Sequence, residues 1–300
     1  MKHTIKILAA LALALASAAP AAAQSDILLQ LRSGNPATDR MRVDSAGGVI
    51  AMGTIGYGII PTTGAGWRMM WHPQKVAFRA GYVDGTQWDE SNIGYYSWAG
   101  GALTTAAAIY SFSMGNNNLI EQGAQGGVAI GGNNKVWGSG VELAYYGVAL
   151  GYSNEVLDQY GVTLGYNNSV DGDAAVAIGY TSTADADYSM AFGYRASTNG
   201  HTGAKVFGDA STTDSIEAVA NNEFAVRAAG GFRFRSNATL TNGCNIAAGG
   251  ASITCASSRT LKENFLEVDG NDILQRMRRI PVSTWNSIDE GRTSRHLGPF

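Results

Sequence analysis

The chain has 300 residues, of which 21 are lysine or arginine, 24 are aspartate or glutamate and 39 are glycine. Charged residues make up only 15% of the chain and form no basic patch, so we expect neither nucleic acid nor an anionic membrane as a partner. Aromatic residues make up 9%, which is enough for a buried core and excludes a low-complexity tail.

The first 23 residues have the composition of a secretory signal peptide. Lys2 and Lys6 form a positive n-region, residues 7–18 form an apolar h-region, and three alanines end at Ala23 before Gln24. The alternative is a short membrane anchor, but the apolar run is shorter than the roughly 20 residues that a spanning helix needs. We therefore expect an exported protein, extracellular or on the cell surface, outer-membrane association included, whose mature chain has no membrane-spanning segment. Its 19 basic and 24 acidic residues would give a net charge of −5.

Residues 24–91 form the first predicted region, a β fibre followed by a cap. Residues 39–54 alternate polar and apolar side chains around a Gly-Gly turn, which predicts a β-hairpin or one layer of a fibre. This plan is similar to short motifs common in phage tail-fibre-like proteins. An aromatic segment follows, with Trp67, Trp71, His72 and Trp88. It is compatible with a ligand site, but the open end of a repeat array needs an atypical cap, so we favour the capping role.

Residues 92–210 contain an internal repeat. Short apolar phrases such as GVAIG, GVALG, GVTLG and AVAIG each end in glycine, and these glycines are spaced by 14, 16, 20, 14, 14, 14 and 15 residues. They are Gly101, Gly115, Gly131, Gly151, Gly165, Gly179, Gly193 and Gly208. Because one coil of this length cannot bury its own apolar face, the spacing predicts a parallel β-roll of stacked coils.

Each coil is expected to contain short strands whose alternating side chains face inward. Val176 with Ile178, and Val162 with Leu164 one coil earlier, are the predicted inward pairs. The glycine after each strand permits a sharp bend.

Asparagine-rich corners fit left-handed turn positions and are expected to stack as side-chain ladders. The corners are Asn116–Asn118, Asn133–Asn134 and Asn167–Asn168. The two longest spacings add corner residues, including Trp137, Tyr145 and Tyr146. Insertions in a solenoid become loops, so we expect a contact surface around residues 133–147.

The pattern of an apolar, a small and an apolar residue followed by glycine, every 14 residues, resembles the head repeats of trimeric autotransporter adhesins. The resemblance covers about residues 92–210. It implies a left-handed parallel β-roll and a homotrimer, with a host receptor, surface or glycan as a further partner. We expect no counterpart of that family's C-terminal membrane anchor within these 300 residues.

Residues 211–256 form a predicted β connector. Residues 222–237 repeat the Gly-Gly plan of residues 39–54. Cys244 and Cys255 follow, and an oxidising compartment favours a local disulfide between them, with two free buried thiols as the alternative. The four histidines, at positions 3, 72, 201 and 296, are scattered, so we expect neither a metal site nor another cofactor.

From Ser257 the predicted architecture changes to a mixed α/β domain. A helix is expected after Asp269 or Asn271, with Pro281 at its end and the strand PVSTW beyond it. Its apolar face would consist of Ile273, Leu274, Met277 and Ile280.

This segment resembles the start of the endosialidase-type intramolecular chaperone, a self-cleaving serine peptidase domain at the C-terminus of many trimeric fibres. The match rests on Ser257, Leu261-Lys262-Glu263-Asn264, Ile280-Pro281-Val282, Trp285, His296, Gly298 and Pro299. The resemblance implies that Ser257 is the nucleophile, that Lys262 is the base, and that the Ala256–Ser257 bond is cut.

Such a dyad needs a lysine that is neutral near pH 7, hence desolvated. Ser258 is a rival nucleophile, but its spacing of four to Lys262 does not fit the family pattern. His296 matches a family position linked to the site, without an assigned role. The match stops inside the HxGP stretch at Phe300, so we expect only the incomplete start of this domain.

Two other functions remain open. One is a phage or prophage tail-fibre receptor-binding protein, against which the signal peptide argues. The other is a carbohydrate-active enzyme, which would need paired carboxylates. The acids near the roll resemble unpaired corner residues; they are Glu142, Glu155, Asp158, Asp171 and Asp173. We therefore predict a mainly β, trimeric, adhesin-like fibre with at most single-turnover autoproteolysis and no turnover of an external substrate.

Overall fold

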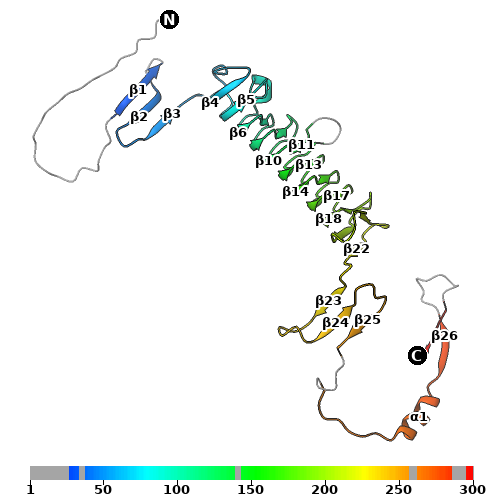
Figure 1. Ribbon diagram of the computed structural model, residues 1–300. Helices are drawn as coiled ribbons and strands as arrows, with labels where there is room; N and C mark the ends of the chain where they lie inside the picture. The colour runs from blue at the N-terminus through cyan, green and yellow to red at the C-terminus, as the bar shows by residue number, and fades with distance from the viewer. Residues whose placement is uncertain (1–26, 34–37, 139–142, 257–261, 286–294, 300) are drawn as a thin grey trace, which may run out of the picture. The chain divides into compact units, whose positions relative to one another are not determined.

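The computed structural model describes residues 27–33, 38–138, 143–256, 262–285 and 295–299. Contacts divide the chain into two units, residues 1–229 and 230–300. The described part is mainly β, with one α-helix, which confirms the predicted fold class at this level (Figure 1). The predicted signal peptide lies outside the described residues.

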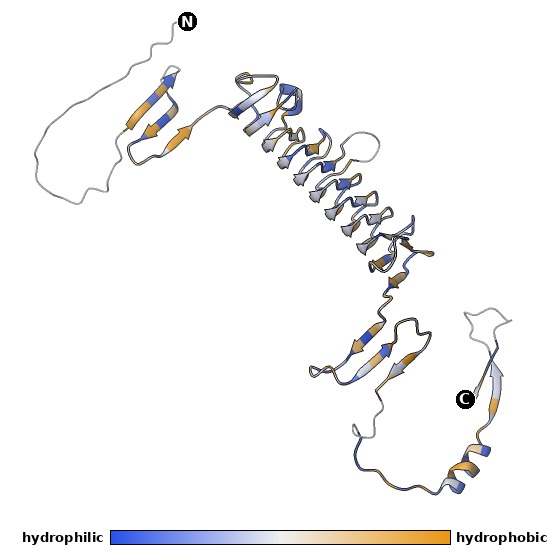
Figure 2. Cartoon of the chain, in the orientation of Figure 1, coloured by the Kyte–Doolittle hydropathy of each residue, from blue (hydrophilic) through white to orange (hydrophobic). Residues whose placement is uncertain are grey.

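The N-terminal region forms a three-stranded antiparallel sheet of β1 (Ile27–Ser33), β2 (Thr38–Asp44) and β3 (Val49–Ala51). The turn after β2 contains Gly47 at φ +88°, and the Asp44 carboxylate accepts hydrogen bonds from the backbone N–H groups of Ala46 and Gly48. An aspartate before a glycine pair is well suited to this turn. The hairpin predicted within residues 39–54 is therefore confirmed, and its strand β3 is hydrophobic throughout (Figure 2).

The roll contains an eleven-stranded main sheet. It begins with an antiparallel hairpin, β4 (Gly66–His72) and β5 (Ala77–Val83), and every later pairing is parallel. The later strands are β6 (Trp98–Ala102), β8 (Phe112–Asn116), β10 (Val128–Gly132), β12 (Val148–Tyr152), β14 (Val162–Tyr166), β16 (Val176–Tyr180), β18 (Met190–Tyr194), β20 (Lys205–Gly208) and β22 (Phe224–Arg227). A short 3-10 helix, η1 (Glu90–Asn92), lies between β5 and β6.

A second sheet of eight two-residue parallel strands forms the other side of the roll. Its strands alternate along the chain with those of the main sheet, so each coil contributes one strand to each sheet (Figure 1). They are β7 (Thr105–Ala106), β9 (Leu119–Ile120), β11 (Lys135–Val136), β13 (Glu155–Val156), β15 (Ser169–Val170), β17 (Thr183–Ala184), β19 (Ala196–Ser197) and β21 (Ile216–Glu217). This arrangement is the predicted parallel β-solenoid.

The repeating glycines align in one column. Each of the eight predicted glycines pairs in register with the next, and Gly81 extends the column by one coil toward the N-terminus. Gly165 shows why the position requires glycine: its φ is +122°, and a Cβ there would lie 2.1 Å from the carbonyl oxygen of Gly179. Both the backbone conformation and the close approach of the next coil exclude a side chain.

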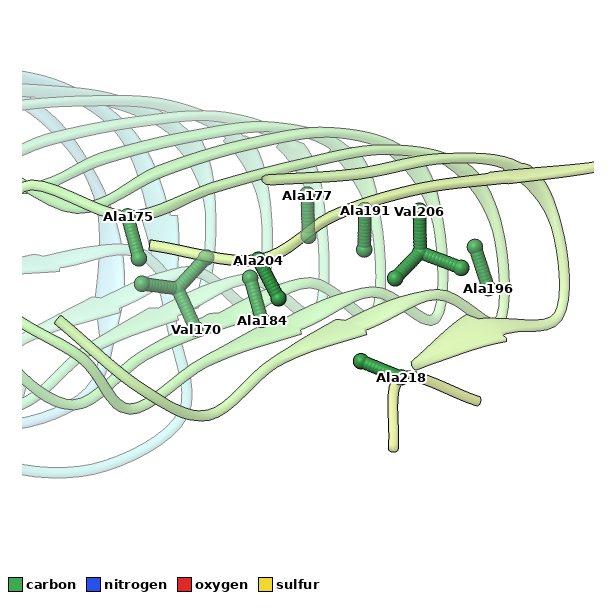
Figure 3. Packing of buried hydrophobic residues seen from close by; sticks show 9 residues of the cluster. All are labelled: Val170, Ala175, Ala177, Ala184, Ala191, Ala196, Ala204, Val206 and Ala218. Carbon is green, nitrogen blue, oxygen red and sulfur yellow. The ribbon is translucent and has the colours of Figure 1, made fainter. Parts of the chain in front are cut away.

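On the main-sheet side, the interior of the roll is lined mostly by small side chains, which corrects the predicted inward pairs. Ala177 and Thr163 are fully buried, whereas Val176 and Ile178 are only partly buried and Leu164 is 43% exposed. Figure 3 shows such buried residues from successive coils, including Ala177, Ala191 and Val206. Both sets of alternating positions are apolar, so periodicity could not select one. The branched side chains of the interior come mainly from the second sheet, where Val156 and Val170 are fully buried.

A column of buried asparagines runs along the inside of one corner. Asn118, Asn134, Asn154 and Asn168 are each at most 1% exposed. At each step the Nδ2 of the later asparagine donates to the Oδ1 of the earlier one, at 3.0 to 3.1 Å, and this Oδ1 also accepts from the later residue's backbone N–H. Ser182 continues the column by donating its backbone N–H to the Asn168 Oδ1 at 2.9 Å.

The predicted asparagine ladders are thus confirmed, and so are the left-handed corners. Asn117, Asn133 and Asn167 have φ values of +50°, +54° and +53°. These residues occupy the turn, with Asn117 and Asn167 exposed and Asn133 partly buried, while the asparagine that follows each of them enters the buried column.

An arginine replaces the small inward residue in the first coil. Arg79 is fully buried, and its guanidinium donates to the carbonyl oxygens of Phe78, Ser97 and Ala106 and to the Ser97 hydroxyl. Burial lowers the pKa of Arg79 to about 9. These bonds join β5 to the following coil.

The N-terminal cap closes the roll with an apolar cluster and an ion-paired carboxylate. Trp88 is fully buried beside Met70, as a cap requires, whereas Trp67 of the same aromatic segment is 84% exposed. Glu90 accepts from His72 Nε2 at 2.9 Å and pairs with Lys75 Nζ at 3.0 Å. Burial raises the pKa of Glu90, but hydrogen bonds from Lys75 and His72, with their charges, more than offset this, so the net shift is downward.

Arg227 closes the other end of the roll. It pairs in register with Gly208 and donates to the Asp209 carboxylate at 2.9 Å and to the Asp209 carbonyl oxygen at 2.7 Å. Hydrogen bonds from the Ser211 hydroxyl, the backbone N–H of Ala229 and Arg227 hold the pKa of Asp209 well below its usual range. Arg227 thus replaces the bend glycine where the column of coils ends.

The second unit contains an antiparallel sheet of β23 (Phe232–Arg235), β24 (Gly243–Ile246) and β25 (Ile253–Cys255). Cys244 lies opposite Cys255 in this sheet, and their sulfur atoms are bonded. The hairpin plan read for residues 222–237 is wrong: β22 pairs with β20 of the roll, whereas β23 pairs with β24. Residues 222–237 share only the local sequence pattern of residues 39–54. Their first strand, β22, pairs with β20 of the last coil instead of forming a hairpin.

The predicted helix and strand are present in the C-terminal segment. Helix α1 (Gly270–Arg278) begins at Asp269, whose side chain accepts from the Asn271 backbone N–H at 2.9 Å, so Asp269 is the cap. The following β26 (Val282–Trp285) pairs antiparallel with β27 (His296–Pro299).

Candidate functional site: the outer face of the roll

The outward side of the main sheet forms a continuous apolar surface, which we call the outer face. Its two columns consist of the outward side chains of β5 through β22, and the outward side of β4 extends it. Members along the columns include Phe78, Trp98, Phe112, Met114, Val128, Ile130, Val148, Leu150, Val162, Leu164, Val176, Ile178, Met190, Phe192 and Phe207. These positions carry no acid, and Lys205 in β20 is their one cation.

Exposure of the outer face is greatest at its two ends, and at the β22 end Phe224 is 67% exposed. Ile130 is 39% exposed in the middle of the roll, Trp98 is 46% exposed, and Trp67 of β4 is 84% exposed. Monomeric soluble proteins seldom leave so large a contiguous apolar surface in water, and such surfaces mark contact sites. The outer face is therefore the strongest candidate for an interaction surface.

Tyrosines flank the outer face on one side. Tyr152, Tyr166, Tyr180 and Tyr194 follow the bend glycines, and their rings stack at centroid distances of 5.8, 4.9 and 5.3 Å. The rings are within 13° of parallel, so their faces cover one another and their edges remain exposed. This stacking repeats with the coils and stabilises the corner.

The outward side of the second sheet is polar. It presents Lys135 and Glu155, with Asp171 and Asp185 on the turns that follow β15 and β17. Burial, together with the charges of Asp158, Asp185 and Glu155, raises the pKa of Asp171. The two sides of the roll thus differ in chemistry: one is apolar and the other is acidic.

The predicted corner surface around residues 133–147 is only partly described, because residues 139–142, including Glu142, lie outside the described residues. Trp137 donates its Nε1 hydrogen to Glu155 at 2.7 Å, and Lys135 Nζ lies 5.2 Å from the Trp137 ring centre. Glu155 is thereby engaged with a side chain of the neighbouring coil. Among the described residues, His, Cys, Asp and Glu side chains form no group that could hold a metal ion.

The predicted self-cleavage residues are only partly described. Ser257 and its rival Ser258 lie outside the described residues. Ala256 is exposed after β25, and Lys262 is exposed in the segment before α1. His296, in β27, stacks on Trp285 with ring centres 4.6 Å apart.

The outer face escaped the sequence prediction because its branched residues were placed inside the roll. A signal was nevertheless present in the sequence. The alternate strand position is small or hydroxylated from β6 to β18, as in Ala129, Ala149 and Thr163, and a narrow interior would select such residues.

The fold and its apolar side define a solenoid module with about eight coils and one face suited to association. Residues 171–196, which include the strands β16 and β18, match the family model of the YadA head domain repeat in two copies. This match supports the resemblance to adhesin head repeats. No curated protein and no solved structure matches the chain. None of the described helices is long and apolar enough to cross a membrane.

Proposed function

We propose that this chain is an exported, surface-displayed, adhesin-like fibre protein that works as a homotrimer. The observation that carries the proposal is the apolar outer face on a roll whose residues 171–196 match the YadA head repeat. The Cys244–Cys255 disulfide adds support for export, since disulfides persist in oxidising compartments.

The charge distribution favours one arrangement of the three chains. Contact through the second sheet would desolvate Lys135, Glu155 and Asp171, and two acids to one base leave a buried negative charge, which is costly. Contact through the outer face buries branched and aromatic side chains, each of which contributes about 1.5–3 kcal/mol when fully buried. The outer faces would therefore meet around a common axis, with the acidic side in water.

Light scattering on the protein expressed with its own N-terminus tests this proposal. We expect a particle of three chains, each beginning after residue 23 by mass spectrometry. Leu164→Glu places a charge on the outer face and should abolish the trimer. The matched control Thr183→Glu adds the same charge to the second sheet, whose outward side is polar, and should leave the trimer intact. A monomeric unaltered protein, or equal effects of the two variants, would contradict the proposal.

A tail-fibre receptor-binding protein is the second candidate, favoured by the plan of residues 39–54. Virion proteins assemble in the cytoplasm, so this function predicts that residues 1–23 remain on the chain. The same mass measurement separates the two functions.

We further propose that the C-terminal segment matures the fibre by cutting the Ala256–Ser257 bond, with Ser257 as the nucleophile and Lys262 as its base. Support comes from the motif and from the Asp269-capped helix and β26–β27 pair that follow it. Ser257→Ala should leave the chain at full length, whereas the control Ser258→Ala should be cut as usual. Shortening of the Ser257→Ala chain would refute the assignment. A receptor or glycan bound by the trimer is a further proposal, which binding of the purified trimer to a glycan array would test.

A further inference from the structure

The middle of the outer face repeats almost identically from coil to coil. Four successive coils place valine at the first outward position and isoleucine or leucine at the second; the pairs are Val128 with Ile130, Val148 with Leu150, Val162 with Leu164, and Val176 with Ile178. These strands are in register, about 4.8 Å apart. A face with this period looks the same after a shift by one coil. Two copies that met only through this part of the face could therefore pack equally well when shifted by one or more coils along the roll. Strands with uniform side chains slip in register for the same reason.

The N-terminal end of the outer face breaks this repeat. Phe78, Trp98 and Phe112 occupy the first outward position of three successive main-sheet strands, and their rings meet edge to face at 5.4 and 5.7 Å. On β4, Trp67 is 84% exposed and Met69 is 79% exposed. Bulky aromatic residues thus replace the valine column over three successive strands at this end, whereas at the β22 end Lys205 and Phe224 occupy that column and Phe192 and Phe207 lie in the second one.

Trp67 and Met69 contribute little to the core of their own chain. The cap is filled by their buried neighbours, among them Met70 and Trp88. Trp67 touches its own chain through the Tyr82 ring, at a centroid distance of 5.1 Å. Its exposed surface is directed away from the cap, on the same side of the sheet as the outer face.

We propose that this aromatic end sets the axial register of the three copies, so that Trp67 and Met69 of each copy pack against the same end of another copy. The inference rests on the proposed homotrimer. The occupant is a second copy because the aromatic end is continuous with the outer face through the β5–β6 pairing and because its outward side chains are uncharged. An offset of one coil would leave Trp67 of one copy beyond the end of its neighbour, still in water.

Disulfide trapping measures the register directly. Chains carrying Val148→Cys and chains carrying Val176→Cys, distinguished by tags of different length, are co-expressed. These positions are two coils apart, about 9.6 Å along the roll, which exceeds the usual Cα separation of a disulfide. Aligned copies should therefore link only like chains. Copies offset by one or two coils bring the unlike cysteines within reach.

The same pair of chains is then made with Trp67→Ala and Met69→Ala. Both side chains are exposed, so the fold is retained, which circular dichroism checks. We expect trimers that persist, because the middle of the outer face is unchanged, with links between unlike chains rising on the order of tenfold. The matched control Tyr57→Ala with Val219→Ala removes two exposed apolar side chains elsewhere and should add no unlike links.

Three results distinguish the register proposal from the homotrimer proposal. Trimers that link only like chains despite Trp67→Ala and Met69→Ala would overturn the register proposal while leaving the homotrimer standing. Unlike links at equal levels in the unaltered protein would also overturn it. A monomeric unaltered protein by light scattering would instead overturn the homotrimer, and the register proposal with it.

Discussion

Removing one member of the buried asparagine column should destabilise the roll in a way that can be calculated from its hydrogen bonds. Asn154 accepts from the backbone N–H and the Nδ2 of Asn168, both at 3.0 Å, and donates to the carbonyl oxygens of Leu150 and Gly165 at 2.9 and 2.8 Å. Asn154→Ala leaves the Asn168 N–H buried without an acceptor, which costs about 1–3 kcal/mol. The lost donations add about 1 kcal/mol, so the free energy of unfolding should fall by about 3 kcal/mol.

Thermal unfolding followed by circular dichroism measures this change. For a domain of 150–250 residues, each kcal/mol shifts Tm by about 2–4 °C, so Asn154→Ala should lower Tm by about 6–12 °C. The matched control is Asn167→Gly, because Asn167 is exposed, has φ +53° and follows a bend of the same kind. Glycine adopts this φ freely, so the control should lie within about 0.5 kcal/mol of the unaltered protein.

A partial rescue strengthens the test. Ser182 occupies the column naturally one coil after Asn168, and its hydroxyl donates to the carbonyl oxygen of Gly193 at 3.2 Å. Asn154→Ser should therefore lie between Asn154→Ala and the unaltered protein. The reasoning is refuted if Asn154→Ala loses no more stability than Asn167→Gly.

Three other changes test the bend, the cap and the buried cation. Gly165→Ala would force a Cβ against the Gly179 carbonyl oxygen and should cost about 2 kcal/mol or more in urea denaturation, whereas Gly230→Ala, in open space, should not. Because folding lowers the pKa of Glu90, its ion pairs stabilise the cap above the ordinary carboxyl value of 4.5, and this contribution is lost as pH falls. Between pH 7 and about pH 3.5, Tm should therefore drop less for Glu90→Gln than for the unaltered protein; an equal drop would count against the pairing. Arg79→Met removes a buried cation that has no acidic partner among the described residues, and the carbonyl oxygens of Ser97 and Ala106 keep their backbone donors, so the change should be neutral or stabilising; a loss above about 2 kcal/mol in urea would contradict this account.

The glycine spacing predicted the strand register of the roll correctly because one position of the coil has a positive φ and a close contact with the next coil, and only glycine fits there. Even the gap of 20 residues before Gly151 did not disturb this register, because Gly151 still pairs with Gly131. Tertiary pairing could not be predicted in the same way. Residues 222–237 have a hairpin pattern, yet β22 pairs in parallel with β20, the preceding strand of the main sheet.

The candidate surface was harder to predict than the fold. In an ordinary strand, alternation separates an apolar inside from a polar outside, but here both sides are apolar, so the inward side was assigned wrongly. Arg79 could not be predicted either, because a lone arginine between Phe78 and Ala80 looks like a solvated charge. Its burial is explained by the carbonyl oxygens of Ser97 and Ala106, which accept hydrogen bonds from its guanidinium.

The in-register stacking of coils also determines how the roll responds to pulling. Successive coils are joined by hydrogen bonds that run along the stack, so tension applied at the two ends loads these bonds one coil after another rather than all together. A coil such as the one from Val162 to Val176 contains 14 residues. Once peeled off, it releases about 40 Å of extended chain, given about 3.4 Å per residue and the 4.8 Å it occupied. The coils of 14 residues would therefore release equal lengths of chain, whereas the coil of 20 residues that ends at Gly151 would release about 20 Å more.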